Sequence, residues 1–90
     1  MNTKVILFTM DGCPHCSDLM NRLNELSIPF KECEITKNRN QWETVVKQTQ
    51  QDLLPTVFIL EDDNGNGVTY TPGRDFNDLD HIIYIIKNSI

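Results

Sequence analysis

The feature that most constrains this chain is a pair of cysteines, Cys13 and Cys16, placed between an apolar run and a helical pattern. The run 5–8 is typical of a buried strand. Pro14 suits the first position of a helix, where its fixed φ fits and its missing N–H costs nothing. Two cysteines three positions apart in the first turn of a helix lie within the roughly 4.4–6.8 Å between Cα atoms that a disulfide needs. The sequence therefore predicts a reversible disulfide at a strand-to-helix turn.

The position in the helix gives the two sulfurs different roles. Cys13 falls at the helix cap, where free backbone N–H groups and the positive end of the helix dipole favour its thiolate. Cys16 lies one turn further in, partly covered by its own helix. We therefore expect Cys13 to be the nucleophile and Cys16 to resolve the mixed disulfide. Pro14 and His15 would tune the redox poise, since a protonated histidine stabilises the thiolate; alternatively, His15 is an exposed spacer.

Length and charge limit the classes of function. Ninety residues suffice for one small domain, which we expect to span residues 1–90. The net charge of −5 gives no positive surface for nucleic acid or an anionic membrane. No apolar run reaches the ~20 residues of a membrane span, and the N-terminus lacks the pattern of a secretory signal. We therefore expect a cytoplasmic monomer with neither a nucleic-acid nor a membrane partner.

The periodicity of apolar residues predicts the element order β-α-β-α-β-β-α. Strands are expected at 4–9, 30–35, 56–60 and 68–71, and helices at 14–26, 40–49 and 76–90. Asn40, with Glu43 three residues later, has the form of a cap for the second helix. The acids from Asp75 onward favour a helical start for the third. The turn 63–67 would join two antiparallel strands, because Asn and Gly tolerate positive φ.

With its motifs in this order, the chain resembles a glutaredoxin over essentially its whole length. Cys13-Pro14-His15-Cys16 stands where glutaredoxins have Cys-Pro-aromatic-Cys, Leu54-Pro55-Thr56 where they have a cis-proline segment, and Gly73-Arg74-Asp75-Phe76 where they have a Gly-rich turn ending in Asp. The resemblance implies a thioredoxin-like α/β fold, with a four-stranded mixed sheet flanked by three helices. A thioredoxin would carry Trp-Cys-Gly-Pro-Cys on a longer chain, and neither is present.

The resemblance also implies a glutathione site beside the cysteines. Pro55 would be cis and lie against the dithiol, with the Leu54 backbone pairing with the cysteinyl part of glutathione. In the turn at Gly73, Arg74 and Asp75 would hold the γ-glutamyl end. Backbone N–H groups at a helix start suit a carboxylate, and the Asp75 carboxylate suits an ammonium. A simple helix cap is the alternative role for Asp75.

Two residues depart from the family pattern. Met10 stands where glutaredoxins usually carry a Lys or Arg that meets a glutathione carboxylate, and Lys37, Arg39 or Gln41 would be the substitutes for that contact. His15 replaces the common Tyr. The resulting dipeptide is like that of the strongly oxidising periplasmic disulfide oxidases and implies a more oxidising poise.

The function implied by the resemblance is that of a thiol–disulfide oxidoreductase acting on protein disulfides or glutathione mixed disulfides. Glutathione would be the co-substrate, no cofactor would be bound, and ribonucleotide reductase is a candidate client. A thioredoxin-like carrier recharged by a flavin reductase stays open, because Met10 removes the usual cation. A redox-inert adaptor is disfavoured because both cysteines are intact.

A metal or iron–sulfur module is the alternative of a different class. It would need Cys33 and His81 as further ligands, and these lack metal-site spacing, so we expect no metal. Cys33 instead has the character of a partly buried hydrophobe, and His81 that of a structural residue. Met10 and Tyr70 are expected to border the site, with strand packing as the alternative for Tyr70.

Overall fold

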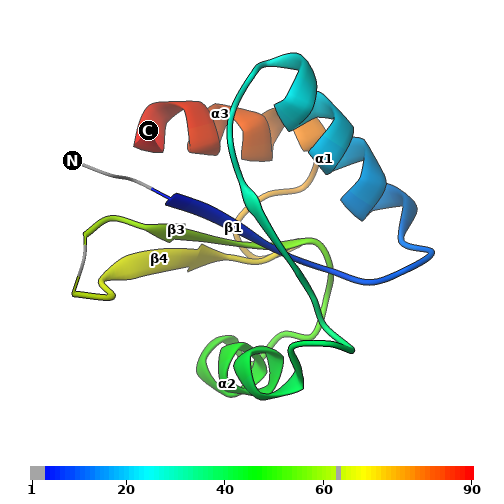
Figure 1. Ribbon diagram of the computed structural model, residues 1–90, viewed down its shortest axis with the longest axis vertical. Coiled ribbons are helices and arrows are strands. Elements are labelled where there is room, and N and C mark those ends of the chain that lie inside the picture. Colours follow the sequence, from blue (N-terminus) through cyan, green and yellow to red (C-terminus); the bar gives the residue numbers. More distant parts are fainter. Residues whose placement is uncertain (1–3, 63) are drawn as a thin grey trace.

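A mixed four-stranded sheet carries helices on both of its faces (Figure 1). The computed structural model describes residues 4–62 and 64–90. Its elements, in chain order, are β1 (Lys4–Thr9), α1 (Pro14–Glu25), β2 (Lys31–Glu34), α2 (Arg39–Thr49), β3 (Thr56–Leu60), β4 (Gly67–Tyr70) and α3 (Leu79–Ser89). The sheet order is β2-β1-β3-β4, with β1 parallel to β2 and the other pairs antiparallel. The predicted element order and mixed sheet are therefore confirmed.

The central strand β1 has apolar side chains on both faces because both faces are covered. Figure 1 shows α1 and α3 on one side of the sheet and α2 on the other. Leu7 points to the first side and is fully buried, and Phe8 points to the second. A continuous apolar run is the pattern expected of a strand covered on both faces. No helix in the described ranges is long and apolar enough to cross a membrane.

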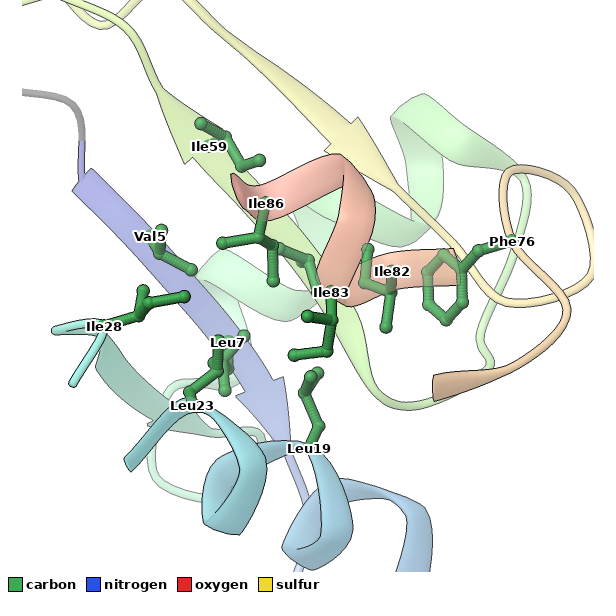
Figure 2. Close-up of a cluster of buried hydrophobic side chains, with 11 residues drawn as sticks. Val5, Leu7, Leu19, Leu23, Ile28, Ile59, Phe76, Ile82, Ile83 and Ile86 are labelled. Atoms are coloured by element: carbon green, nitrogen blue, oxygen red, sulfur yellow. The ribbon is translucent and has the colours of Figure 1, made fainter. Parts of the chain in front are cut away.

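The larger core lies between the sheet and the helices α1 and α3 (Figure 2). Its buried residues are Val5, Leu7, Leu19, Leu23, Ile28, Val57, Ile59, Phe76, Ile82, Ile83 and Ile86. Full burial of one such aliphatic or aromatic side chain stabilises the fold by about 1.5–3 kcal/mol. Tyr70 packs against this cluster from β4, so it has the strand-packing role that the sequence analysis gave as its alternative. The cluster holds α1, which contains Cys16 and is capped by Cys13, against the sheet.

A smaller cluster fills the space between the sheet and α2. It consists of Phe8, Cys33 and Val45, with Trp42 packed against Phe8 at a ring-centroid distance of 5.7 Å. The register pairs Phe8 with Cys33 on neighbouring strands. Cys33 is a buried free thiol among apolar side chains, as its expected hydrophobic role requires.

The start of α2 corrects the sequence prediction. The N-cap residue is Asn38, and Asn40 lies inside the helix. The Asn38 side chain makes no capping bond; its Nδ2 donates to the Glu34 carbonyl oxygen at 2.9 Å. The chain leaves β2 through a tight turn in which the Glu34 carboxylate accepts hydrogen bonds from Thr36. These bonds lower the pKa of Glu34. The cap of α2 thus lies two residues earlier in the chain than predicted.

The start of α3 also differs from the prediction. The helix begins at Leu79, because the Asp78 carboxylate caps it by accepting the His81 backbone N–H at 2.8 Å. Phe76 is therefore outside the helix, although it is buried in the larger core. The His81 side chain is exposed. It does not pack in the core, so the structural role expected for it is not a packing role.

The β3–β4 hairpin turns at Gly65, whose φ of 87° is in the left-handed region. The Asp62 carboxylate accepts the backbone N–H groups of Asn64 and Asn66, and these bonds, with one from the Asn66 side chain, lower the pKa of Asp62. The predicted turn includes Asp63, which lies outside the described residues. β4 then begins at Gly67, one residue earlier than predicted.

Gly67 has no room for a side chain. A Cβ at this position would lie 2.5 Å from the Ile59 carbonyl oxygen and 2.6 Å from Phe58 Cζ. Gly67→Ala is therefore expected to lower the free energy of unfolding by about 1–3 kcal/mol, because the hairpin backbone must shift. Urea unfolding measures the change, with Val68→Ala on the exposed side of the same strand as the control. Equal stability of Gly67→Ala and the parent protein would contradict the close approach.

Candidate active site

The first of the two cysteines caps the helix that contains the second. Cys13 is the N-cap residue of α1 and Pro14 is the first helical residue, as predicted. The Cys16 backbone N–H donates to Cys13 Sγ at 3.2 Å. The preceding turn is closed by the Cys13 N–H, which donates to the Met10 carbonyl oxygen at 3.2 Å, and Gly12 adopts a φ of 79° there. The sulfur of Cys13 therefore lies at the positive end of α1.

The two sulfurs differ in their access to solvent. Cys13 and Cys16 form a disulfide in this structure, with their Cα atoms 5.3 Å apart. Cys13 is half-buried, and Cys16 is only 1% exposed. A second molecule can therefore reach the sulfur of Cys13 but not that of Cys16. This arrangement suits an attacking thiolate at Cys13 and an internal thiol at Cys16.

The loop before β3 lies at the same end of the sheet as the cysteines. The Leu54–Pro55 peptide bond is cis, as the family resemblance implies. The Thr56 hydroxyl donates to the Leu53 carbonyl oxygen at 2.7 Å and holds this loop. Phe8 pairs with Thr56 in the β1–β3 register, so the end of β1 leads to Met10 beside this loop. Within the described chain no hydrogen bond engages the Leu54 backbone, which leaves its N–H and C=O free.

A hollow of about 250 Å³ lies beside the disulfide turn. Of the residues predicted for the site, His15, Leu54, Pro55 and Gly73 line this hollow together. Arg74 and Asp75 are not among its lining residues. The structure thus brings together residues of three segments that are far apart in the sequence.

Sequence reasoning missed two acidic residues of the hollow, Asp18 and Asp78. A signal existed for Asp18, because it follows His15 by three positions and residues at this spacing share one face of a helix. No comparable signal existed for Asp78. Its position depends on the irregular segment 71–78, which the periodicity assigned in part to a helix.

Arg74 and Asp75 hold the turn after β4. Asp75 Oδ2 accepts the Thr71 backbone N–H at 2.8 Å and Arg74 Nε at 2.9 Å, while the Arg74 guanidinium also donates to the Thr69 carbonyl oxygen at 3.0 Å. The Asp75 N–H donates to the Thr71 carbonyl oxygen. Since α3 begins at Leu79, the expectation that Arg74 and Asp75 offer helix-start N–H groups is wrong, as is the alternative of Asp75 as a helix cap.

Ionised Asp75 stabilises this turn. Burial opposes its ionisation, but the hydrogen bonds from Arg74 and Thr71 outweigh burial and lower the pKa of Asp75 below its usual value. A carboxyl group with a lowered pKa stabilises the folded state above the unfolded pKa of about 4. This stabilisation is lost as the pH falls from about 4 through the lowered pKa of the folded state.

We expect Asp75→Asn to lower the free energy of unfolding by about 1 kcal/mol at pH 7, because the variant loses charge-assisted hydrogen bonds. The difference from the parent protein should shrink below pH 4 and vanish once Asp75 is protonated in both states. Urea unfolding at pH 7 and pH 3 measures both differences. Glu43→Gln, on the exposed side of α2, removes the same charge as a control and should leave the free energy of unfolding at pH 7 within about 0.5 kcal/mol of the parent protein. A constant deficit for Asp75→Asn would contradict the lowered pKa.

The surface around the cysteines lacks the cation that the family usually places there. Met10 is 45% exposed at the end of β1. The candidate substitutes Lys37, Arg39 and Gln41 are all exposed, at the turn before α2 and in its first turn. Position 10 therefore offers an exposed apolar side chain, and it is followed by the exposed acid Asp11.

A metal centre would need ligands beyond the two cysteines. Cys33 is buried in the cluster beneath α2, and His81 is exposed on α3. Across residues 4–62 and 64–90, no group of three or more His, Cys, Asp or Glu side chains is arranged to hold a metal ion. Among the described residues, Cys33 and His81 thus lie in different parts of the fold, one beneath α2 and the other on α3.

Comparison with known proteins agrees with the geometry. The family model described as Glutaredoxin matches residues 5–63, which include the cysteine turn, the cis-proline segment and three of the strands. No curated protein matches the chain significantly. The matched segment is well over half of the chain.

Solved structures share the fold at low sequence identity. A buckwheat glutaredoxin–glutathione complex is 16% identical with a TM-score of 0.62, and the match covers 96% of this chain and 70% of that one. The holo form of glutaredoxin C1 from Populus tremula x tremuloides is 16% identical with a TM-score of 0.60, covering 93% and 74%. Thioredoxin f2 from Chlamydomonas reinhardtii is 20% identical with a TM-score of 0.63, covering 96% and 77%. The thioredoxin-like fold is therefore shown.

Proposed function

Since the chain belongs to the glutaredoxin family of thiol–disulfide oxidoreductases, we propose that it reduces protein disulfides and glutathione mixed disulfides through Cys13, with glutathione as the reductant. The observation that carries this proposal is the contrast between the two sulfurs. Cys13 is accessible at the helix N-terminus and accepts the Cys16 N–H, whereas Cys16 is buried behind it.

The proposed reaction has two exchange steps. The Cys13 thiolate attacks one sulfur of the substrate disulfide, forms a mixed disulfide and expels the other sulfur as a thiolate. The Cys16 thiolate then attacks Cys13 Sγ, breaks the mixed disulfide and releases the second substrate thiolate, which takes a proton from water. The substrate gains two electrons, and the protein is left with the Cys13–Cys16 disulfide seen in this structure.

Two molecules of glutathione would return the protein to the dithiol form. The first opens the disulfide and leaves glutathione on Cys13, and the second attacks that mixed disulfide and departs as oxidised glutathione. The free Leu54 backbone, in the loop that lines the hollow together with His15, supports this step, because its N–H and C=O can pair with the peptide groups of glutathione. The similarity in fold to a glutaredoxin crystallised with glutathione is also consistent with the proposal.

The experiment is a redox equilibrium in buffers of varied reduced-to-oxidised glutathione ratio, combined with mass spectrometry of a Cys16→Ser variant. We expect a potential in the glutaredoxin range of roughly −200 to −230 mV, with glutathione bound to Cys13 in the variant. A more oxidising value would mean that His15 governs the poise. A far more reducing potential without a glutathione adduct would overturn the proposal.

That last outcome would favour the second candidate function, a thioredoxin-like carrier recharged by a flavin reductase. The exposed Met10 favours it, because position 10 lacks the cation that the family usually places there to meet a glutathione carboxylate. Turnover of NADPH by a flavin thioredoxin reductase, with this protein as its disulfide substrate, is the direct measurement.

Met10→Lys is expected to increase the affinity for glutathione. A lysine at the end of β1 would place an ammonium beside the Leu54 loop, and an exposed ion pair is worth about 0.2–1 kcal/mol, or roughly 1.5- to 5-fold in affinity. The measurement is the KM for glutathione in the reduction of a small disulfide. Met10→Leu is the matched control. If both variants gave the same KM, the missing cation would not limit glutathione binding.

A further inference from the structure

A second hollow lies at the end of β1 that is opposite to the cysteines. It has a volume of about 340 Å³ and is lined by the start of β1, the segment 29–31 that leads into β2, and Leu60 at the end of β3. We call this hollow, which contains Lys4 and Lys31, the lysine cleft. β1 runs from Lys4 toward the cysteine turn (Figure 1), and its rise of roughly 3.3 Å per residue places about 16 Å of strand between its two ends. The lysine cleft is therefore separate from the redox site.

Four side chains of the lysine cleft share the face of the sheet on which α2 packs. Ile6 packs against the smaller cluster on this face, and side chains two positions apart on a strand point to the same side. Lys4 therefore points to this face from β1, and Lys31 does so from β2 because it alternates with the buried Cys33. Leu60 joins them from β3, where it pairs with Lys4. Among the described residues that line the cleft, none belongs to α2, so α2 does not cover this end of the face.

The base of the lysine cleft is apolar. Ile6, Phe30 and Leu60 are half-buried, and Pro29 completes the apolar lining. Ile6 and Phe30 are also packed against the two core clusters, so the surface they present is held in place. An aliphatic chain resting on it would be removed from water together with these side chains. The volume is at the lower end of the roughly 300–1,000 Å³ of small-molecule sites, which suits a short chain.

The lysine cleft is positive, although the chain as a whole has a net charge of −5. Lys4 and Lys31 are exposed, and no Asp or Glu of the described ranges lines the cleft. The neighbouring acid Glu32 points to the opposite face, where it accepts the Thr9 hydroxyl at 2.7 Å. Lys31 pairs with Ile6, so Lys4 is its diagonal neighbour, with roughly 8 Å between the two Cα atoms. Two flexible ammonium groups at this spacing can meet at one anionic head group.

We propose that the lysine cleft binds a short aliphatic carboxylic acid, with its chain on Ile6, Phe30 and Leu60 and its carboxylate between Lys4 and Lys31. The inference goes beyond the proposed function and does not depend on it, because no cysteine lines the cleft. An aliphatic amine would have the same shape but would bring a like charge to the two lysines. Acetate would bring the charge but leave the apolar base in water. Both parts of the ligand are therefore required.

The test follows the amide NMR spectrum of the oxidised protein as octanoate, octylammonium or acetate is added. Octanoate is expected to shift the amides that line the cleft and to leave those of the cysteine turn unshifted; the shifted amides are those of Val5, Ile6, Phe30, Lys31 and Leu60. Its dissociation constant should be below that of hexanoate by about 4-fold for each additional CH₂ that the cleft buries. Octylammonium and acetate should leave these amides unshifted at the concentration at which octanoate half-saturates the cleft.

Two double variants separate the local charge from the net charge. Lys4→Gln/Lys31→Gln should weaken octanoate binding by about 2- to 30-fold, as the loss of two exposed ion pairs allows. Lys47→Gln/Lys87→Gln removes the same charge from exposed positions of α2 and α3 outside the cleft, and it should bind octanoate as tightly as the parent protein does. The amide spectrum of each variant also reports whether it is folded. The comparison of octanoate with octylammonium needs only the parent protein and so does not depend on the variants.

The inference would be overturned if octanoate shifted no amide of the cleft at about 10 mM, or if octylammonium bound equally well. Equal weakening in both double variants would also overturn it, since the effect would then come from net charge. Shifts confined to the cysteine turn would place octanoate in the other hollow. Shifts of the cleft amides on raising the protein concentration alone would mean that a second copy of the chain covers the cleft. None of these results bears on the proposed function, which the glutathione equilibrium tests separately.

Discussion

The Cys13→Ser variant is expected to be inactive: disulfides should be reduced no faster in its presence than by glutathione alone. Serine cannot form a disulfide, and Cys16, at 1% exposure, cannot be reached by a substrate in its place. The loss should therefore be complete for both protein disulfides and glutathione mixed disulfides. The measurement is the rate of reduction of each substrate at fixed glutathione concentration, compared with the rate without protein.

Cys16→Ser is the matched variant because it should separate the two substrates. It keeps the attacking thiolate and so retains turnover of glutathione mixed disulfides, in which a second glutathione can release Cys13. It should lose the reduction of intramolecular protein disulfides, where Cys16 is needed to resolve the mixed disulfide. An active Cys13→Ser variant beside an inactive Cys16→Ser variant would reverse the two roles.

Leu23→Ala is expected to lower the free energy of unfolding by about 2–5 kcal/mol. Leu23 is 0% exposed and packs α1 against the sheet, so its truncation leaves a cavity beneath the helix that carries both cysteines. A domain of 90 residues has a total stability of about 5–13 kcal/mol. This single change could therefore remove a large part of the stability.

Urea unfolding measures this loss, and Asn21→Ala in the exposed part of α1 is its control. The control should change the stability by less than about 0.5 kcal/mol. If Leu23→Ala were no more harmful than Asn21→Ala, α1 would not depend on the larger core for its position.

The strands and the cysteine turn were predictable because their signals are local. The dense apolar runs gave β1 and β3 with their exact bounds, since a strand buried on both faces needs such residues throughout. Pro14 and the cysteine spacing likewise gave the start of α1. The cis bond at Pro55 came from family resemblance, as local sequence alone favours the trans form of an X–Pro bond.

The helix starts were less predictable because side chains there have competing partners. Asn38 binds the Glu34 carbonyl oxygen, and Asp75 binds Arg74 and Thr71. The pattern of capping residues does not show which of these bonds will form. The two acidic residues of the hollow were missed because the fold brings Asp18 and Asp78 together from positions sixty residues apart in the sequence.

Because Cys33 is buried under α2, the folded protein can form only one intramolecular disulfide, the one between Cys13 and Cys16. The Cys33 thiol lies on the face of the sheet opposite to the larger core, closed in by Phe8, Val45 and Trp42, so it cannot exchange with the Cys13–Cys16 disulfide without unfolding. Scrambling to a Cys13–Cys33 or Cys16–Cys33 isomer is thereby blocked while the fold is intact. An alkylating reagent should accordingly label no thiol in the native oxidised protein and one thiol after denaturation.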